Sequence, residues 1–329
     1  MRDLDTWWTS AEWLAQAQGW IHQVLSEKSI RLTGPITQPV VRFWSVHLHV
    51  PTDAGLLWFK ENGPASAFEA GLIAALAELT PHRVVTPLAV DTSRGWLLSP
   101  DAGPTLRATG GGHVDDWIRI AGELARWQRD LSAHPRELLD AGLPVLANAD
   151  AVALVDAEAT ALAALPAPDP RSLDVRHLAQ IRAGLPLLTE AVSILDAAPV
   201  PPSLQHNDLH ANNTFSPASG RLRFFDFGDA LWGHPFAALM VPLQTLRRAA
   251  ADQADLIRVR DAYLEVYTDL LPRADLLPMV AAAERLAAVH RYVVWRAVIA
   301  HAPPDELVTW GPRTTAWLSR ATAEPADAT

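Results

Sequence analysis

One short polar segment interrupts the helical part of this chain. Residues 203–227 read SLQHNDLHANNTFSPASGRLRFFDF, whereas the sequence on both sides carries the apolar spacing of amphipathic helices. We predict these helices at 113–133, 150–164, 174–196, 234–250, 255–271, 278–301 and 304–321. Within the interruption we predict three strands, at 203–206, 213–217 and 221–227, the last two joined by a turn at 217–220. The fold must therefore place a small β-rich insert, with a polar loop, inside a mostly helical unit.

The first hundred residues have a different pattern. After a tryptophan-rich helix at 6–27, the sequence is rich in β-formers and is punctuated by Gly-Pro, Gln-Pro and Asp-Ala-Gly. The expected order is three strands, one helix and two strands. These elements lie at 30–33, 40–50, 55–61, 64–80, 83–91 and 95–101. The loop 102–112 then marks a boundary, so we predict two lobes, 1–101 and 102–329.

Composition excludes several classes of protein. Nearly half of the 329 residues are apolar, which predicts a packed protein, and no cysteine is present for a disulfide or a thiolate metal site. The net charge of −10 disfavours a broad nucleic-acid surface. No run of 18 apolar residues and no signal peptide are found, so we expect a cytoplasmic protein without membrane attachment. Nothing in the sequence indicates an oligomeric state.

The stretch HNDLHANN at 206–213 allows three interpretations. His206, Asp208 and His210 alternate along the chain and could hold a metal ion; the asparagines could form a turn; or the stretch could be a catalytic loop. In the third interpretation Asn213 and Asp226 converge and offer hard oxygens, which suit Mg²⁺ shared with phosphate groups. Asp208 can then face a substrate hydroxyl, the division of labour that phosphoryl transfer needs.

Two motifs together resemble one family. His206, Asp208, Leu209, His210 and Asn213, followed by FFDFGDA, are similar to the catalytic core of the aminoglycoside phosphotransferase family, which shares the protein-kinase fold. One position departs, because Asn207 stands where the family usually has glycine. The resemblance implies an α+β, two-lobed protein-kinase-like fold, with a five-stranded antiparallel sheet, one main helix and an N-terminal helix in the first lobe and a mostly helical second lobe.

The resemblance also implies an activity. It predicts an enzyme that uses ATP and Mg²⁺ to phosphorylate a hydroxyl of a small molecule, which could be an amino sugar, an aminoglycoside, another sugar or an amino alcohol. Asp208 would accept the hydroxyl proton, and Asn213 and Asp226 would hold the metal. His206, His210 and Asp229 would support the loop. After DFG, His234 and Ala238 replace two acidic residues of the family, which puts antibiotic specificity in doubt.

Further residues of the nucleotide site follow from the same resemblance. Lys60, at the end of GLLWFK, would bind the phosphates, and Glu69 in the next helix would hold it in place. Backbone groups of the hinge would contact the purine; its residues are Ser99, Asp101 and Ala102. Gly34 in TGPITQPV could belong to a loop that covers the phosphates, or could serve only a turn.

Two other functions remain open at this stage. A nucleotide-binding module with little catalysis would keep the same residues. A metal hydrolase built on His206, Asp208 and His210 would leave Lys60, Glu69 and the DFG motif unexplained. A protein kinase is the weaker variant of the leading hypothesis, because no A-P-E segment follows DFG.

Overall fold

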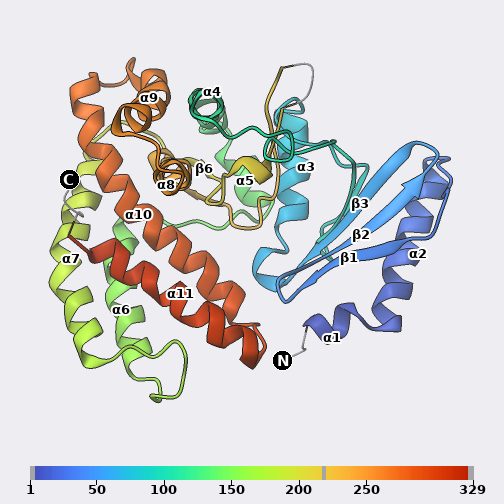
Figure 1. Ribbon diagram of the computed structural model, residues 1–329, viewed down its shortest axis with the longest axis horizontal. Coiled ribbons are helices and arrows are strands. Elements are labelled where there is room, and N and C mark those ends of the chain that lie inside the picture. Colours follow the sequence, from blue (N-terminus) through green and yellow to red (C-terminus); the bar gives the residue numbers. More distant parts are fainter. Residues whose placement is uncertain (1–3, 217–219, 325–329) are drawn as a thin grey trace.

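The computed structural model describes residues 4–216 and 220–324. Its first part is an antiparallel sheet of five strands in the order β1-β2-β3-β5-β4, which confirms the predicted sheet. The strands are β1 (Thr37–Arg42), β2 (Ser45–Thr52), β3 (Gly55–Asn62), β4 (Ala89–Asp91) and β5 (Trp96–Pro100). Between β3 and β4 the chain forms a 3-10 turn, Pro64–Ser66, and helix α3 (Glu69–Leu79), which lies beside the sheet (Figure 1).

The first hairpin differs from the prediction. The strand expected at 40–50 is two strands, β1 and β2, joined at Phe43 and Trp44, and the strand expected at 30–33 is only a bridge between Leu32 and Thr52. The turn contains no glycine, proline, asparagine or aspartate, so no local signal marks it. It depends on distant contacts: Phe43 is buried, and Gly63 N–H donates to Trp44 O at 2.8 Å. The strand expected at 83–91 is likewise shortened to β4.

The tryptophan-rich N-terminus covers one face of the sheet. Helices α1 (Leu4–Trp8) and α2 (Ala11–Glu27) pack on the side chains of β2, β3 and β5. Three indole N–H groups, from Trp8, Trp13 and Trp96, donate to the Glu61 carboxylate at 3.0, 2.7 and 2.6 Å. Side chains alternate along β3, so Phe59 joins this core while Lys60 faces the opposite side.

The second part of the chain is mainly helical, as predicted. Its helices are α4 (Val114–Leu131), α5 (Pro135–Asp140), α6 (Ala151–Ala163), α7 (Val175–Asp196), α8 (Met240–Arg248), α9 (Gln253–Leu264), α10 (Arg273–Ile299) and α11 (Pro304–Thr322). Helix α5 was not predicted, and the helices expected at 234–250 and 255–271 each contain a 3-10 segment, at Pro235–Leu239 and Glu265–Tyr267. Helices α10 and α11 pack together and face the sheet across the molecule (Figure 1).

The β-rich insert is smaller than expected. Strand β6 (Ser203–Gln205) pairs with β9 (Leu231–Gly233), and β7 (Thr214–Phe215) pairs with β8 (Arg223–Phe224). The sequence did not reveal β9, because a buried run of three residues carries no periodicity. Residues 217–219 of the expected turn lie outside the described residues.

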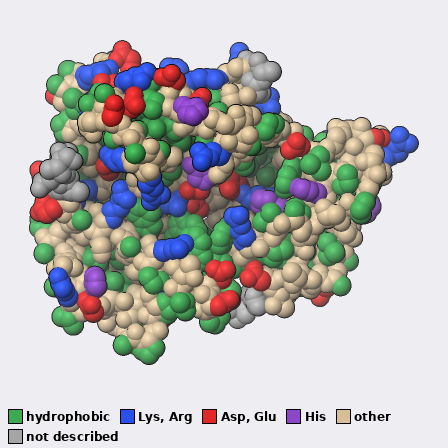
Figure 2. Space-filling view, viewed as in Figure 1, with side chains coloured by type: hydrophobic (Ala, Val, Ile, Leu, Met, Phe, Trp, Pro, Cys, Tyr) green, Lys and Arg blue, Asp and Glu red, His purple; other side chains and the backbone are tan. Residues whose placement is uncertain are grey.

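Two large hydrophobic cores do not divide at the boundary between the two parts of the chain. One joins α1, α2 and one sheet face; the other joins α3, Leu97 and the helices. The boundary after residue 101 remains a prediction. Within 4–216 and 220–324, only α7 is long and apolar enough to cross a bilayer by length and composition, and it packs against α6, α10 and α11. Figure 2 shows a hollow between the sheet side and the helical side, with basic side chains gathered around it.

Candidate active site

A lysine and two carboxylates join the sheet, helix α3 and the DFG segment. Lys60 on β3 lies 2.6 Å from Glu69 Oε2 and 2.7 Å from Asp226 Oδ1. Burial alone would lower the pKa of Lys60, but the charges of Asp226 and Glu69 outweigh it, and the pKa is raised above its ordinary value. Lys60 is therefore a fixed cation at the junction of three segments.

Glu69 connects this cation to the backbone of the DFG segment. Its side chain is 3% exposed; Oε1 accepts the Phe227 N–H at 2.7 Å, and Oε2 accepts from both Lys60 and the Asn62 amide. A second link runs through Ser66, whose hydroxyl donates to Gly228 O at 2.7 Å. The start of α3 therefore fixes the position of the DFG backbone.

The catalytic loop turns at a residue in the left-handed region. Asn207 has a φ of 58°, a conformation that favours glycine and that asparagine tolerates better than most residues. This explains how Asn207 can replace the family's glycine. Its amide also donates to Asp229 O at 2.9 Å, a bond that glycine could not make.

His206 contacts the backbone of this loop and of the DFG segment through its ring nitrogens. It is fully buried, and Nε2–H donates to Phe225 O at 2.9 Å, while Nδ1 lies 3.4 Å from the Asp208 N–H. Burial lowers the pKa of His206, so the ring is neutral. Both ring nitrogens are engaged with the backbone, which does not suit the metal site considered for His206, Asp208 and His210.

Asp208 lies on the loop with its carboxylate one-third exposed. Its Oδ2 is 3.4 Å from His210 Nε2, its Oδ1 is 3.3 Å from Arg291 Nη1, and Asn213 Nδ2 donates to its carbonyl at 2.9 Å. Burial raises the pKa of Asp208, but the hydrogen bond with His210 and the charge of Arg291 outweigh it, so the pKa is lowered. The hydrogen bond with Asp208 in turn raises the pKa of His210. Asp208 is thus ionised, loosely held and open to a ligand.

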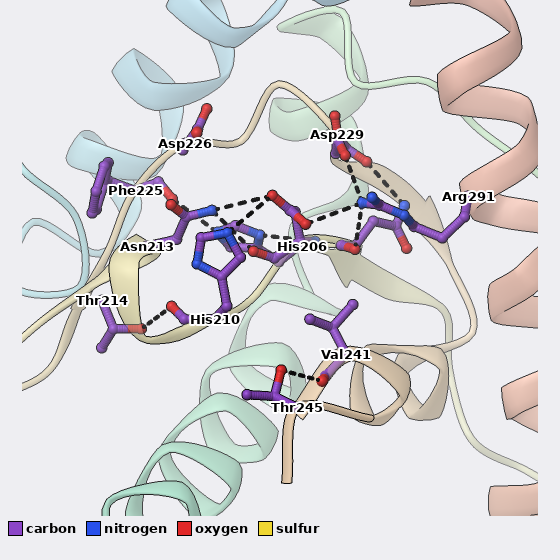
Figure 3. Close-up of polar contacts among 12 residues, drawn as sticks. His206, His210, Asn213, Thr214, Phe225, Asp226, Asp229, Val241, Thr245 and Arg291 are labelled. Carbon is purple, nitrogen blue, oxygen red and sulfur yellow. Dashed lines mark hydrogen bonds and ion pairs between the residues drawn. The ribbon is translucent and has the colours of Figure 1, made fainter. Parts of the chain in front are cut away.

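Arg291 links the loop to the segment after DFG (Figure 3). It extends from α10, is 12% exposed, and its Nη1 donates to Asp229 Oδ2 at 2.6 Å and to Asn207 O at 2.9 Å. The Trp295 N–H also donates to Asp229 Oδ2, at 3.2 Å. Burial raises the pKa of Asp229 to about 6, against the opposing charge of Arg291. Asp229 therefore lies in the site, bonded to Arg291 and Trp295, and its role as a support of the loop remains a prediction.

Asp226 and Asn213 form a donor set that fits Mg²⁺. The Asp226 side chain is 47% exposed, and only its Oδ1 is bonded to Lys60. Burial raises its pKa, but the charge of Lys60 outweighs burial and the pKa falls to about 2. The Asn213 amide donates through Nδ2, which leaves its oxygen free. No cluster of three His, Cys, Asp or Glu able to hold a metal occurs in 4–216 or 220–324, and Mg²⁺ shared with phosphates needs only one or two protein ligands.

An apolar cavity of about 220 Å³ lies between β3, β5, α3 and the small hairpin. Lys60, Glu69 and Asp226 line it, and so do the predicted hinge residues Ser99, Asp101 and Ala102. Asp101 is placed at the cavity, but its N–H donates to Leu56 O at 2.9 Å and cannot contact a purine. The N–H of Ala102 has no backbone partner among the described residues, so Ala102 offers the free donor.

Gly34 does not lie with the other site residues. It precedes β1 and stands beside Pro51, whose ring would be 3.3 Å from a Cβ at this position. Pro51 is four residues along β2 from His47, the partner of Lys60, which corresponds to about 13 Å. Of the two interpretations of Gly34, a phosphate-covering loop or only a turn, the structure favours the turn, because the hairpin nearest the site turns at Phe43 and Trp44.

A second, wider cavity of about 530 Å³ opens on the other side of Lys60. It shares His47, Lys60 and Asp226 with the apolar cavity and contains Asp208 and Asn213. Burial and then Lys60 lower the pKa of His47 to about 4, so this histidine is neutral. The two cavities therefore meet at Lys60 and Asp226, one apolar and one containing Asp208.

Much of the lining of the second cavity could not be predicted from the sequence. Arg291 and Trp295 come from α10, Trp310 from α11 and Trp44 from the first hairpin. The spacing of four residues between Arg291 and Trp295 indicates only a shared helix face, which is equally typical of packing. No local motif could have brought these four residues together.

The comparisons with known proteins agree with this geometry. A family model described as "Phosphotransferase enzyme family" (APH) matches residues 59–277. No curated protein matches the chain. Among solved structures, a macrolide 2'-phosphotransferase type I is 15% identical with a TM-score of 0.60, covering 96% of this chain and 99% of its own. An ethanolamine kinase from Plasmodium vivax is 11% identical with a TM-score of 0.63, covering 96% and 90%.

A spectinomycin phosphotransferase in complex with ADP and spectinomycin is similar as well. It is 10% identical with a TM-score of 0.56, and the match covers 93% of this chain and 98% of that one. At such low identities the structural similarity shows a shared fold alone, while the family model extends over more than half of the chain. The chain therefore belongs to the APH phosphotransferase family, whose members transfer a phosphoryl group to a hydroxyl of a small molecule.

Proposed function

We propose that this enzyme binds Mg²⁺-ATP in the apolar cavity and phosphorylates an acceptor hydroxyl held in the wider cavity. The observation that carries the proposal is the meeting of the two cavities at Lys60 and Asp226, with Asp208 facing the acceptor side. A nucleotide whose base lies near the hinge can extend its phosphates toward Lys60. An acceptor beside Asp208 then approaches from the opposite side, which suits in-line transfer.

Each residue of the junction has one task in this proposal. Ionised Asp208 accepts a hydrogen bond from the acceptor hydroxyl, orients it and takes its proton. Lys60, fixed by Glu69, binds the phosphates through its charge. Asp226 and Asn213 hold Mg²⁺, which would neutralise charge on the phosphate oxygens. His206, His210 and Asp229 hold the loop in position.

The fold alone does not choose among amino sugars, aminoglycosides, other sugars and amino alcohols as acceptors. The structural neighbours include enzymes named for macrolide, spectinomycin and ethanolamine, so the fold accommodates acceptors of very different size. We place the enzyme in the cytoplasm, where ATP is available and where a chain without cysteine is unaffected by the reducing conditions.

A pair of variants tests the role of Asp208. Asp208→Asn removes the proton acceptor but keeps the size of the side chain, so we expect acceptor-dependent ADP release to fall about 100-fold or more, in keeping with the usual contribution of general base catalysis. Mg²⁺-ATP binding, measured by calorimetry, should change less than threefold. The matched control is Asp115→Asn, a substitution at an 88% exposed side chain on α4, which should behave as wild type.

Three results would contradict the proposal. Near-normal turnover by Asp208→Asn would exclude the proposed role of Asp208. ATP binding without ADP release for any acceptor would indicate a nucleotide-binding module. ATP-independent hydrolysis by a zinc- or manganese-loaded sample would revive the metal hydrolase.

A further inference from the structure

Arg42, at the end of β1 before the first hairpin turn, is an exposed cation in the lining of the wider cavity. Among the described residues of this lining, the other lysine and arginine side chains belong to Lys60 and Arg291. Each of these two forms ion pairs with two carboxylates. Arg42 forms no ion pair in the described ranges 4–216 and 220–324, and its guanidinium lies 5.4 Å from the centre of the Trp44 ring. The charge of Arg42 is therefore available to a ligand of the cavity.

The strand register places Arg42 beyond Lys60 as seen from the hinge. The hinge residue Ser99 pairs with the position of β3 two residues before Lys60. The position two residues after Lys60 pairs with Ser45, which in turn pairs with Arg42 on β1. Two residues of a strand span about 7 Å, so phosphates that extend from the hinge pass Lys60 before they reach Arg42. In agreement with this order, Lys60 lines both cavities and Arg42 lines only the wider one.

The tip of this hairpin is held against the helical part of the chain. Trp44 makes edge contacts with Trp295 on α10 and Trp310 on α11, with ring centroids 5.8 and 5.4 Å apart. On the sheet side, Gly63 N–H donates to Trp44 O at 2.8 Å. Arg42 therefore extends from a turn that is fixed on two sides. A side chain on a fixed turn loses less conformational entropy on binding than one on a free loop.

The balance of charge at the junction favours a further cation there. The carboxylates that line the two cavities are Glu69, Asp101, Asp208, Asp226 and Asp229. Lys60 and Arg291 can balance only two of these charges, and a triphosphate brings additional negative charge, which Mg²⁺ offsets in part. Arg42 is close enough to act on this place, because its charge and that of Lys60 add to the effect of burial in lowering the pKa of His47, the partner of Lys60 on β2.

We infer that Arg42 binds the terminal phosphate of ATP from the side of the wider cavity and stays bound to it during transfer. This inference rests on the proposed function and adds a phosphate-binding residue to it. In the transfer, the bond from the terminal phosphorus to the β–γ bridging oxygen breaks as the bond to the acceptor oxygen forms. ADP keeps the bridging oxygen, and Asp208 takes the hydroxyl proton. The Arg42 guanidinium donates to the non-bridging oxygens of the transferred group and forms no covalent bond.

Two nucleotides that differ in the terminal phosphate test the inference. For Arg42→Ala, the Kd of Mg²⁺-AMP-PNP, measured by calorimetry, should rise at least about tenfold, the effect of losing a hydrogen bond between charged groups. The Kd of Mg²⁺-ADP should change by less than about twofold, which also shows that the variant is folded. Arg42→Lys keeps the charge without the forked donors and should recover part of the affinity for AMP-PNP. The matched control is Arg94→Ala, because Arg94 is exposed, also lies over a tryptophan ring, at 4.3 Å, and lines neither cavity.

The outcomes separate this inference from the proposed function. Equal losses of affinity for ADP and AMP-PNP in Arg42→Ala would overturn the inference, because Arg42 would then act on the site as a whole. An unchanged affinity for AMP-PNP would overturn it as well, while the phosphotransferase proposal would stand. With an acceptor that the wild type turns over, a rise confined to the KM of the acceptor would assign Arg42 to acceptor binding instead. Failure of the wild type to bind either nucleotide would refute the proposed function, and the inference with it.

Discussion

Replacing Glu69 by glutamine should weaken both the fold and the nucleotide site. Three donors converge on this carboxylate: the Phe227 N–H on Oε1, and the Lys60 ammonium and the Asn62 amide on Oε2. Glutamine has one oxygen, and its NH₂ group cannot accept a hydrogen bond. Either orientation of the new amide therefore sets a donor against at least one donor in a buried site.

The structure sets the size of this effect. An unsatisfied buried donor costs about 1–3 kcal/mol. Lys60 also loses one of its two carboxylate partners, but it keeps Asp226 at 2.7 Å, so the loss is smaller than for a fully broken buried pair. We expect the free energy of unfolding to fall by about 2–4 kcal/mol. In a chain of this length, that corresponds to a decrease in Tm of roughly 3–6 °C.

Two assays measure the outcome. Scanning calorimetry gives the Tm, and ADP release at varied ATP gives the kinetic constants. Because Lys60 is less well held, kcat/KM for ATP should fall about 10- to 100-fold, equivalent to about 1.4–2.8 kcal/mol. Glu78→Gln, at an exposed position on the same helix, is the matched control. A Tm within about 1 °C of wild type together with an unchanged kcat/KM for ATP would refute the reasoning about the three donors.

Three further positions test how polar residues in and around the site contribute to stability. Asn207→Ala must keep a φ of 58° and loses the bond to Asp229 O, so urea denaturation should show a loss of about 1–2 kcal/mol, against less than about 1 kcal/mol for Asn207→Gly. The folded pKa of Asp229, about 6, exceeds its unfolded value, so its stabilisation is full below about pH 4 and is lost as pH rises through 6. Asp229→Asn should therefore remove a decline of about 2–3 kcal/mol between about pH 4 and 7.5, and parallel stability curves would contradict this. Burial lowers the pKa of His290 to about 3, so stability falls as the pH drops below about 6.5. His290→Leu should reduce the loss between about pH 7 and 5 by about 2 kcal/mol, measured by the same urea denaturation.

Local sequence patterns predicted the helices and strands that are determined by residues close together in the sequence. Periodicity located the long helices and most of the sheet, and the order of Lys60, Glu69, Asp208 and Asp226 placed side chains that the structure brings to one junction. The chemistry of phosphate transfer requires these residue types in a fixed order along the chain, on a strand, a helix and two loops, so a single sequence can show the pattern. Their individual roles remain predictions until the variants are measured.

The failures share a physical cause. The turn at Phe43 and Trp44 is held by Gly63 and by burial rather than by turn-forming residues, and without that turn the sequence could not decide between the two interpretations of Gly34. The second cavity depends on where α10 and α11 pack, which is a tertiary property. A tryptophan or arginine on an amphipathic helix gives the same sequence pattern whether it faces a core or a ligand.

The site residues that the sequence could predict and those that it could not lie in different segments of the chain. Lys60, Asp208, Asn213 and Asp226 lie within the stretch 59–277 that matches the family. Three tryptophans of the second cavity lie outside it: Trp44 before residue 59, and Trp295 and Trp310 after residue 277. The shared segment therefore contains the residues proposed for the phosphate chemistry, and the flanking segments supply part of the wall of the second cavity. Inferring the acceptor from the name of a structural neighbour would rely on segments of the chain that the family match does not cover.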